Sequence, residues 1–547
     1  MPHLLIVCQM ACQAVFQECW PTVFALTVRS VFGVIFLFIL PLLWLPGLQA
    51  NTTYPPPSGN SPYQFDSVAI PSDTYVVNDT DSSTLDYYMY RGDSGGYDIT
   101  VPINIRRYVG NVNTLLEKRM IAETFNFYIP AFDVDASNSR VVDCDGDGVQ
   151  DSLKPEVNEV YFNDEFVGVL KGANDIWTLN EFELDVQKLN FPMSPTGDVG
   201  HNTIGIKIDV ANRNVVLSSG QAGCKVWATE VDWAAVQFAV TSPVVFVPGL
   251  SGRADSFVNS AYQVNLAANV GLPSEIISHT AFVPSLSACG RGMPSVVEHA
   301  MQMRQSIKAV AERYGTDSVN LIAHSKGGWD SRVFLIELAE NPIPVRVGEM
   351  GGQPVLSDLI VTSMVTHGTP YEGTVIADMV VAYGGPLLFL FSDFCDLSTQ
   401  VARQVNRTLG DLPKGITSLL IGADADQNYD GQIDDYEATG NQVGSSMANR
   451  FYQKLRDVDR IYVEFVPNPE DTFQTIPVVV EVPTNTPQLN DTMVSVESAV
   501  AMPGATVIAG KNFVGENGRN HGTVLDVQVQ DLVINAGVFG PLNWRLR

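Results

Sequence analysis

The sequence predicts an all-β sandwich domain followed by an α/β domain with a parallel sheet. Beyond residue 241, stretches that are apolar throughout alternate with helical stretches, as in "SVNLIAH" followed by "GGWDSRVFLIELAE". A further sheet strand is predicted at 475–484, "TIPVVVEVPT". Such strands are typical of a parallel sheet covered on both faces. From 66 to 240 the pattern is short alternating runs between turn residues, with almost no helical periodicity, which favours a sandwich. The 547 residues also exceed what one hydrophobic core usually holds.

The first 50 residues are predicted to be an export signal. Residues 31–45, "VFGVIFLFILPLLWL", form an apolar run that follows Arg29 and precedes "PGLQA". We therefore expect cleavage near Ala50, a Pro/Ser/Asn-rich linker over 51–65, and a secreted protein, either extracellular, periplasmic or at the cell surface. A transmembrane anchor is the alternative interpretation of the same run.

The charge of the chain argues against nucleic acid as a partner. It carries 32 basic and 60 acidic residues, a formal net charge of −28. Phosphate backbones repel such a surface. The same charge is compatible with secretion or with bound divalent cations, and nothing in the sequence sets the oligomeric state.

The predicted sandwich contains a stretch, 160–186, that resembles jelly-roll modules of the galactose-binding type, in which a short hairpin precedes a Trp. The resemblance implies an accessory domain that binds carbohydrate, lipid or polymer. A domain that serves only packing or secretion is equally compatible with the pattern.

Ser325 is the candidate nucleophile. In "DSVNLIAHSKGGWDSRVFL", 317–335, it stands between a buried strand and an amphipathic helix, with Ala323 two residues before it and Gly327 two residues after. A nucleophile elbow requires small residues at these places because the strand and helix backbones pass closely there. The helix also directs its positive N-terminal end at the hydroxyl.

Three motifs together resemble the secreted bacterial triacylglycerol lipase/esterase branch of the α/β-hydrolase superfamily. They are "PVVFVPGLSG", "VNLIAHSKGGWDSR" and "VTHGTPYEGT", in the order of the family, and the resemblance covers about 241–547. It implies an α/β-hydrolase fold and an oxyanion hole formed by the amides of Leu250 and Lys326. Pro248 stands where the family has His, which leaves the amide donor intact but alters the pocket.

The chain order of this superfamily is Ser, then the acid, then His. After Ser325 only His367 and His521 remain. His521 lies near the C-terminus in a Gly/Asn loop and is the expected general base, whereas His367 is expected to line the pocket. Asp491 resembles the acid of the family, and Glu497 is the fallback.

Residues 375–420 include an apolar run and occupy the place where lipases carry a helical flap. A mobile lid and a buried core helix are both compatible with the run. Of the four cysteines beyond the leader, separately folding domains would pair Cys144 with Cys224 and Cys289 with Cys395.

Two acidic loops are predicted to bind calcium as a structural cofactor. Residues 426–437, "DQNYDGQIDDYE", match the EF-hand loop at every defined position. The expected ligands there are Asp426, Asn428, Asp430, Gln432, Asp434 and Glu437. Residues 143–151, "DCDGDGVQD", resemble thrombospondin-type calcium repeats, with Asp143, Asp145, Asp147, Val149 and Asp151 as the expected set and Lys154 in place of the closing Glu.

The sequence thus predicts a secreted serine ester hydrolase, a lipase or carboxylesterase, in which Ser325, Asp491 and His521 cleave acyl glycerols or related lipid esters at an interface. One alternative is an extracellular polyester depolymerase of the same fold. Another is a calcium-dependent binding protein without activity.

Overall fold

The computed structural model describes residues 76–78, 87–90, 98–134, 139–144, 146–173, 176–222, 228–250, 254–278, 295–383, 392–439, 444–469, 471–507 and 513–539. The predicted leader and linker, 1–65, lie outside these residues. The described residues fall into two compact units, a β unit containing Ile121–Val240 and an α/β unit containing Thr241–Pro541 together with Asn113–Met120. No helix of the described ranges is long and apolar enough to cross a membrane.

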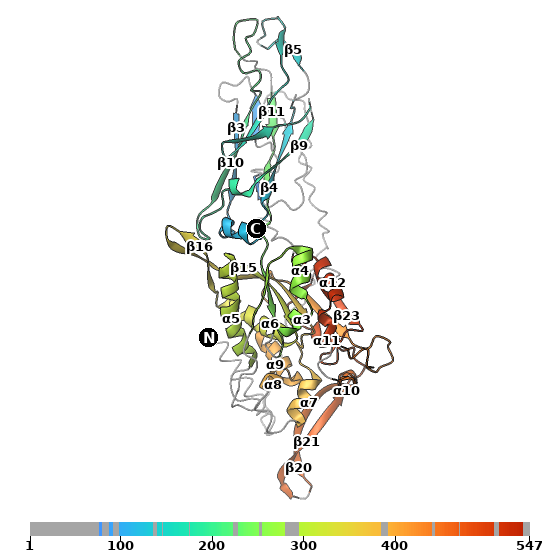
Figure 1. Cartoon of the computed structure of the whole chain (residues 1–547). Helices are drawn as coiled ribbons and strands as arrows, with labels where there is room; N and C mark the ends of the chain where they lie inside the picture. Colours follow the sequence, from blue (N-terminus) through green and yellow to red (C-terminus); the bar gives the residue numbers. More distant parts are fainter. Residues whose placement is uncertain are drawn as a thin grey trace, which may run out of the picture. The chain divides into compact units, whose positions relative to one another are not determined.

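The β unit contains two antiparallel sheets (Figure 1). One has the order β1 (Val76–Asn78), β12 (Ala234–Gln237), β4 (Thr124–Phe132), β11 (Ala228–Val231) and β2 (Tyr87–Tyr90), with β9 (Trp177–Asp185) also paired to β4. The other has the order β3 (Asp98–Ile105), β10 (Gly200–Lys207), β7 (Glu159–Phe162) and β8 (Glu165–Val169). The two short strands β5 (Arg140–Val142) and β6 (Asp151–Leu153) pair with each other, and η2 (Val186–Lys188) follows β9. The helix α2 (Val112–Glu117), between β3 and β4 in the chain, belongs to the α/β unit from Asn113 onward.

Alternating burial produces the core of this unit. Every second residue of β3 is buried, which is the period of a strand with one face in the core. Rings of Phe125 and Phe127 from one sheet contact the ring of Phe162 from the other, at centroid distances of 5.3 and 5.4 Å. The inner faces of both sheets therefore share one aromatic core.

The α/β unit is built on a seven-stranded sheet in which all pairs are parallel. Its order is β14 (Ser274–Ile276), β13 (Val244–Val247), β15 (Ser318–His324), β18 (Ile360–His367), β19 (Thr417–Asp424) and β22 (Thr506–Val507), with β23 (Phe513–Asn517) also paired to β19. The predicted fold class, an α/β-hydrolase domain preceded by an all-β domain, is confirmed.

Helices cover both faces of this sheet (Figure 1). On one side α5 (Ser295–Tyr314) and α6 (Lys326–Glu340) pack on each other and on β15. On the other, α3 (Asp255–Asn259), α4 (Tyr262–Val270) and α12 (Val527–Asn535) contribute Phe257, Leu266 and Val529 to a core shared with the strands. The remaining elements are α7 (Val375–Tyr383), α8 (Ser392–Asp396), α9 (Thr399–Leu409), α10 (Ser445–Asp457), α11 (Val496–Ala499), η4 (Thr523–Leu525) and the hairpin β16–β17 (Pro344–Met350, Gln353–Asp358).

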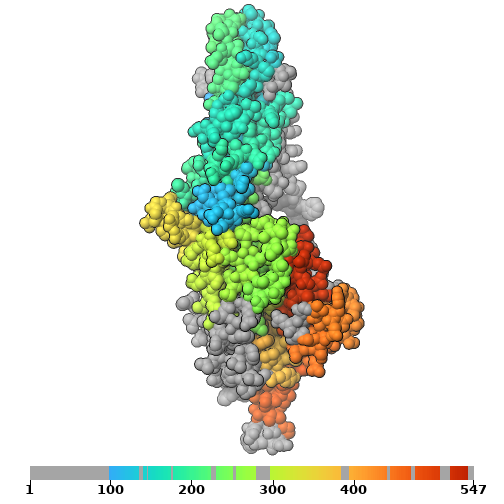
Figure 2. Space-filling model, viewed as in Figure 1, coloured from blue at the N-terminus to red at the C-terminus, as the bar shows by residue number. Residues whose placement is uncertain are grey.

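One predicted sheet strand is wrong. Residues 475–484 have the pattern of a buried strand, but most of them belong to β21 (Asp471–Pro483). Among the described strands, β21 pairs only with β20 (Val458–Asn468), in a separate antiparallel hairpin. The base of the hairpin packs on α7 and α10 through Val458 and Ile461, and the hairpin stands out from the rest of the α/β unit (Figure 2). Both faces of the hairpin carry apolar residues, among them Phe465, which is 61% exposed. The sequence pattern is therefore the same as that of a strand buried on both sides.

Candidate active site

Ser325 occupies the sharp turn between β15 and α6. Its φ of 55° and ψ of −133° put a non-glycine residue in a sparsely populated backbone region. The backbone N–H of Ser325 donates to the backbone oxygen of His367 at 2.8 Å, which ties the turn to the end of β18. The strained turn presents the hydroxyl at the carboxyl end of the sheet.

Glycines make this turn possible by letting three backbones meet. A Cβ on Gly249 would lie 2.8 Å from the Cβ of Ser325, and one on Gly327 would lie 2.4 Å from the backbone oxygen of Pro248. A Cβ on Gly328 would lie 2.1 Å from the Thr369 hydroxyl oxygen. Gly327, which the sequence pattern singles out, is therefore required sterically, and so are Gly249 and Gly328.

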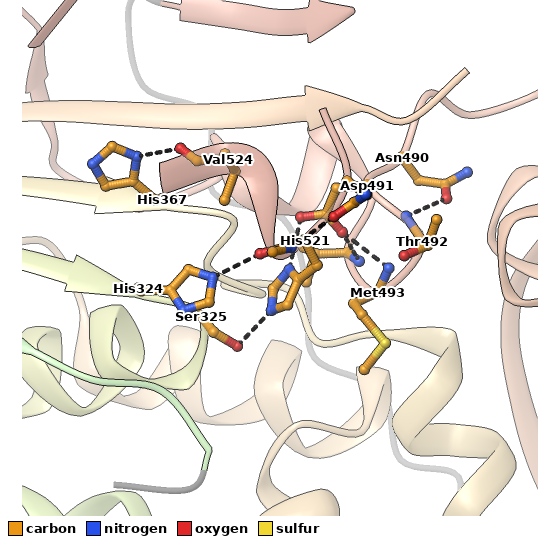
Figure 3. Close-up of polar contacts among 12 residues, drawn as sticks. His324, Ser325, His367, Asn490, Asp491, Thr492, Met493, His521 and Val524 are labelled. Atoms are coloured by element: carbon orange, nitrogen blue, oxygen red, sulfur yellow. Dashed lines mark hydrogen bonds and ion pairs between the residues drawn. The ribbon is translucent and has the colours of Figure 1, made fainter. Parts of the chain in front are cut away.

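The structure brings Ser325, His521 and Asp491 together in one line of hydrogen bonds (Figure 3). The Nε2 atom of His521 lies 2.8 Å from the hydroxyl oxygen of Ser325, and its Nδ1 atom lies 2.8 Å from Oδ2 of Asp491. Because a carboxylate oxygen accepts, Nδ1 carries the hydrogen and Nε2 can take the Ser325 proton. This is the arrangement of a nucleophile, a general base and an orienting acid.

The loop around Asp491 holds its carboxylate in place. Its Oδ1 atom accepts from the backbone N–H groups of Met493 (2.9 Å) and Val494 (2.7 Å), and the His521 N–H donates to the Asp491 backbone oxygen at 2.8 Å. Asp491 is 1% exposed. The fallback acid, Glu497, is exposed on α11, whereas the hydrogen bond to Nδ1 of His521 is made by Asp491.

Two further histidines lie buried beside the catalytic residues. The Nε2 atom of His324 is 2.9 Å from the backbone oxygen of His521, and burial lowers the pKa of His324 well below its ordinary value. This histidine was missed in the sequence, where it is simply the residue before Ser325. It supports the backbone of the general base from below (Figure 3).

His367, which was expected to line the pocket, is fully buried and has a partner at each ring nitrogen. It is 0% exposed, and burial lowers its pKa to about 3, so that the ring is neutral. Its Nδ1 atom lies 3.1 Å from the backbone oxygen of Val524, which can only accept, and its Nε2 atom therefore accepts from the hydroxyl of Tyr262 at 3.3 Å. The role of His367 in the structure is to join β18 to the C-terminal segment.

Of the two expected oxyanion-hole residues, Lys326 adjoins the nucleophile in the chain, and Leu250 adjoins a glycine that packs against the nucleophile. Lys326 is the first residue of α6, and Leu250 follows Gly249, whose backbone passes against Ser325. Their role as amide donors stays a prediction. The Lys326 side chain, by contrast, has a partner set that was missed: its ammonium lies 2.7 Å from Oδ1 of Asp330 and 2.7 Å from Nδ1 of His299.

This cluster is completely buried. The side chains of Lys326, Asp330 and His299 are all 0% exposed. Because an ammonium only donates, Nδ1 of His299 accepts and carries no hydrogen. The i,i+4 spacing of Lys326 and Asp330 on a helix is the signal that could have revealed their pairing.

The loop 426–437 has a compact internal arrangement. Asp426 accepts from the N–H groups of Asp430 (3.2 Å) and Gly431 (2.7 Å), and Glu437 accepts from those of Gln427 (2.7 Å) and Asp434 (3.1 Å). Its donor set consists of oxygen atoms, which suits a hard cation such as calcium. In the described ranges no group of three or more His, Cys, Asp or Glu side chains gathers closely enough to hold a metal. Calcium here stays a prediction.

The second acidic loop is described in part, because Asp145 lies outside the described residues. Asp143 accepts from the N–H groups of Gly146 (2.8 Å) and Gly148 (2.9 Å), while Asp151 accepts from Ser218 (2.8 Å). Asp147 accepts from the Ser218 hydroxyl at 2.9 Å, and Val149 is exposed. Calcium binding at this loop likewise stays a prediction.

The predicted disulfides and lid fall largely on residues outside the described ranges. Cys144 and Cys395 are both disulfide-bonded, and their expected partners, Cys224 and Cys289, are among the residues left undescribed, as is 384–391 within 375–420. On the described flanks, the Asp378 carboxylate of α7 accepts from the N–H (2.8 Å) and hydroxyl (2.7 Å) of Thr399. These flanks are packed into the body of the unit.

The chain is similar to a known lipase. It is 30% identical over 176 residues to a triacylglycerol lipase of Burkholderia plantarii, a match that covers 30% of this chain and 40% of that protein's length. No family model matches. Among solved structures, the mature Bacillus licheniformis lipase BlEst2 aligns with a TM-score of 0.33 at 16% identity, covering 55% of this chain and 92% of that one. Phospholipase PlaB of Legionella pneumophila aligns with a TM-score of 0.25 at 14% identity, covering 45% and 51%.

Proposed function

We propose that this protein is a secreted serine hydrolase of carboxylic esters, acting on acyl glycerols or related lipid esters. The observation that carries the proposal is the line of hydrogen bonds from Ser325 through His521 to Asp491, with both distances at 2.8 Å. The similarity to a triacylglycerol lipase supports lipid esters as the substrate class.

The proposed reaction has two halves. The Ser325 oxygen attacks the ester carbonyl carbon while its proton passes to Nε2 of His521. The tetrahedral intermediate collapses, its C–O bond to the alcohol breaks, and the alcohol leaves with the proton from His521. Water then attacks the acyl-enzyme, with His521 first taking and then returning a proton, and the carboxylic acid leaves.

Asp491 stabilises the imidazolium that forms in each half-reaction. The Leu250 and Lys326 amides are proposed to donate to the oxyanion, at about 3 kcal/mol for each donor. Calcium, if bound at the acidic loops, is proposed to stabilise those loops and to take no part in bond breaking.

Hydrolysis of p-nitrophenyl esters with acyl chains from two to sixteen carbons tests this proposal. The wild type is compared with Ser325→Ala and with the control Ser306→Ala, whose hydroxyl bonds only to its own helix. We expect Ser325→Ala alone to lose hydrolysis, and the chain-length profile to separate an esterase from a lipase. Lack of hydrolysis and of fluorophosphonate labelling in folded wild type would favour a binding protein instead.

A further inference from the structure

The hairpin β20–β21 leaves large apolar side chains exposed. Its base packs on α7 and α10 through Val458 and Ile461, and its strands continue outward from there (Figure 1). In this outer part Tyr462, Ile476 and Val478 are 37%, 37% and 39% exposed. A two-stranded hairpin is at best marginally stable in water unless further strands or a helix cover it. The outer part of this hairpin is therefore expected to have a partner.

The register of the two strands assigns these exposed residues to one face. Directly opposite residues of antiparallel strands point to the same side, and every second residue of a strand shares that side. We call this side the Tyr462 face. Its members are Arg460, Tyr462, Glu464 and Val466 of β20 and Ile476, Val478, Val480 and Val482 of β21. The opposite side includes Ile461, which packs against α7 at the base.

The edges of the hairpin are poorly suited to pair with another strand. The Ile461 N–H donates to Oδ2 of Asp378 in α7 at 3.0 Å, so it points away from β21. Because opposite residues share this direction and it alternates along each strand, positions 467 and 477 also face outward. Both are prolines, which have no N–H to donate. A partner is therefore expected on a face of the hairpin and not at an edge.

Two opposite charges lie on the Tyr462 face at equal distances along the strand from Tyr462. Arg460 and Glu464 are both exposed, and neither belongs to an ion pair of the described residues. A twofold axis through Tyr462, perpendicular to the strand, would set Arg460 of each chain beside the partner's Glu464. The face is thus complementary to itself in charge as well as in its apolar centre.

We propose that the Tyr462 face joins two copies of this chain in a symmetric dimer. The apolar side chains pack at its centre, and the two Arg460–Glu464 pairs flank them, as is usual for an interface with a polar rim. A lipid surface is disfavoured as the occupant of this face, because Glu464 would enter hydrocarbon without a counter-ion. From residue 460 to 466 the face is about 20 Å long, which is small for an interface, so the dimer is reversible.

Sedimentation velocity across a wide range of protein concentrations tests the proposal. The variants are Arg460→Glu, Glu464→Arg and the double variant that carries both changes. Glu340→Arg, a charge reversal at the exposed end of α6, is the matched control. Phe465→Ser removes the exposed apolar side chain of the opposite face. Thermal unfolding of each variant establishes that the α/β unit is folded.

We expect wild type, Glu340→Arg and Phe465→Ser to dimerise with similar Kd values. Each single reversal on the Tyr462 face should weaken the dimer at least about tenfold, because like charges then meet across the axis. The double variant restores opposite charges and should dimerise as wild type does. The two single variants should also pair with each other when they are mixed, because the mixed dimer again places opposite charges across the axis.

A wild type that stays monomeric at every concentration would overturn the proposal, and so would dimers that both single variants keep. Loss of the dimer that neither the double variant nor the mixture restores would do the same. Dimers lost only in Phe465→Ser would assign the interface to the opposite face. A monomeric wild type that floats with phosphatidylcholine vesicles would assign the hairpin to a lipid surface instead. Ester hydrolysis is not measured in this test, so its outcome is independent of the proposed function.

Discussion

The side-chain amide of Asn520 donates to the backbone oxygens of Glu437 (2.9 Å) and Thr439 (2.8 Å). The residue before His521 is thereby tied to the closing end of the acidic loop 426–437. The N–H of Arg519 also donates to the backbone oxygen of Asp424, just before this loop, at 3.0 Å. Order in the acidic loop is thus coupled to the segment that presents the general base.

Calcium should stabilise the protein through this loop. At a concentration one hundred times its Kd, an ion that binds only the native state adds about 2.7 kcal/mol to the free energy of unfolding. We expect calcium to raise the Tm by several degrees relative to chelator, and Asp426→Asn to abolish that rise. Calorimetry with and without calcium measures both.

Asp435→Asn is the matched control, because Asp435 stands at a loop position that provides no ligand in the EF-hand pattern. It removes the same charge and should keep the calcium-dependent rise. An equal rise in wild type and Asp426→Asn would refute calcium binding at 426–437.

Replacing the orienting acid should reduce turnover strongly. In Asp491→Asn the amide can donate to Nδ1, which favours the tautomer in which Nε2 carries the hydrogen and cannot take the Ser325 proton. A decrease of about 10⁴-fold in kcat is expected. Glu497 is the fallback acid, and Glu497→Gln should have a kcat close to that of wild type. A large decrease of kcat in Glu497→Gln, with none in Asp491→Asn, would assign the role of orienting acid to Glu497.

The candidate catalytic residues could be identified from the sequence because they lie in short recognisable motifs and follow a fixed order along the chain. Small residues at 323 and 327 indicate the elbow at Ser325, and chain order leaves His521 as the late histidine. His324 and His299 could not be found in this way. Their roles depend on contacts with residues 197 and 27 positions away, which no local pattern encodes.

The buried pair of Lys326 and Asp330 should be costly to break. Removing one partner leaves a buried charge without its counter-ion, at about 3–5 kcal/mol. We expect Asp330→Asn to lower the free energy of unfolding of the α/β unit by that order, and the double variant Lys326→Met, Asp330→Leu to restore most of it. Urea unfolding measures the difference.

A partly exposed pair with the same spacing provides the comparison. Lys308 and Glu312 are each about one third exposed, and Glu312→Gln should cost at most about 0.5 kcal/mol. If Asp330→Asn cost no more than Glu312→Gln, the buried pair would contribute nothing beyond a surface pair.

The β unit should lose stability as the pH rises. Burial, and then the charge of Asp133, raises the pKa of the Glu230 carboxyl from 4.5 to about 7. The folded state therefore holds a proton that the unfolded chain releases above about pH 4.5, and the stabilisation is lost between that pH and 7. The pKa difference of Glu230 between the unfolded and folded states corresponds to about 3 kcal/mol of the free energy of unfolding.

Glu230→Gln should remove this dependence, because an amide does not ionise. Calorimetry from pH 5 to pH 8 is expected to show the β-unit transition falling in wild type and nearly level in the variant. The exposed Glu123→Gln is the control and should follow wild type. A parallel decline in wild type and Glu230→Gln would assign the pH dependence to other groups.

The limits of the fold prediction are visible at β21. Val478, Val479 and Val480 form an apolar run of the kind that parallel sheets bury. The run belongs to a hairpin because β21 pairs with β20. Periodicity reports how apolar a strand is on each face, but not which partner covers that face.

The close contacts at Gly249, Gly327 and Gly328 have a consequence for how such a protein can diversify. Each position lacks room for a single methyl group, and the neighbouring atoms include the nucleophile itself and the backbone of the adjacent strand end. Directed evolution toward new esters should therefore leave these three glycines unchanged. Substitutions that change the ester preference should instead lie in the loops around the active site, while the catalytic residues stay the same.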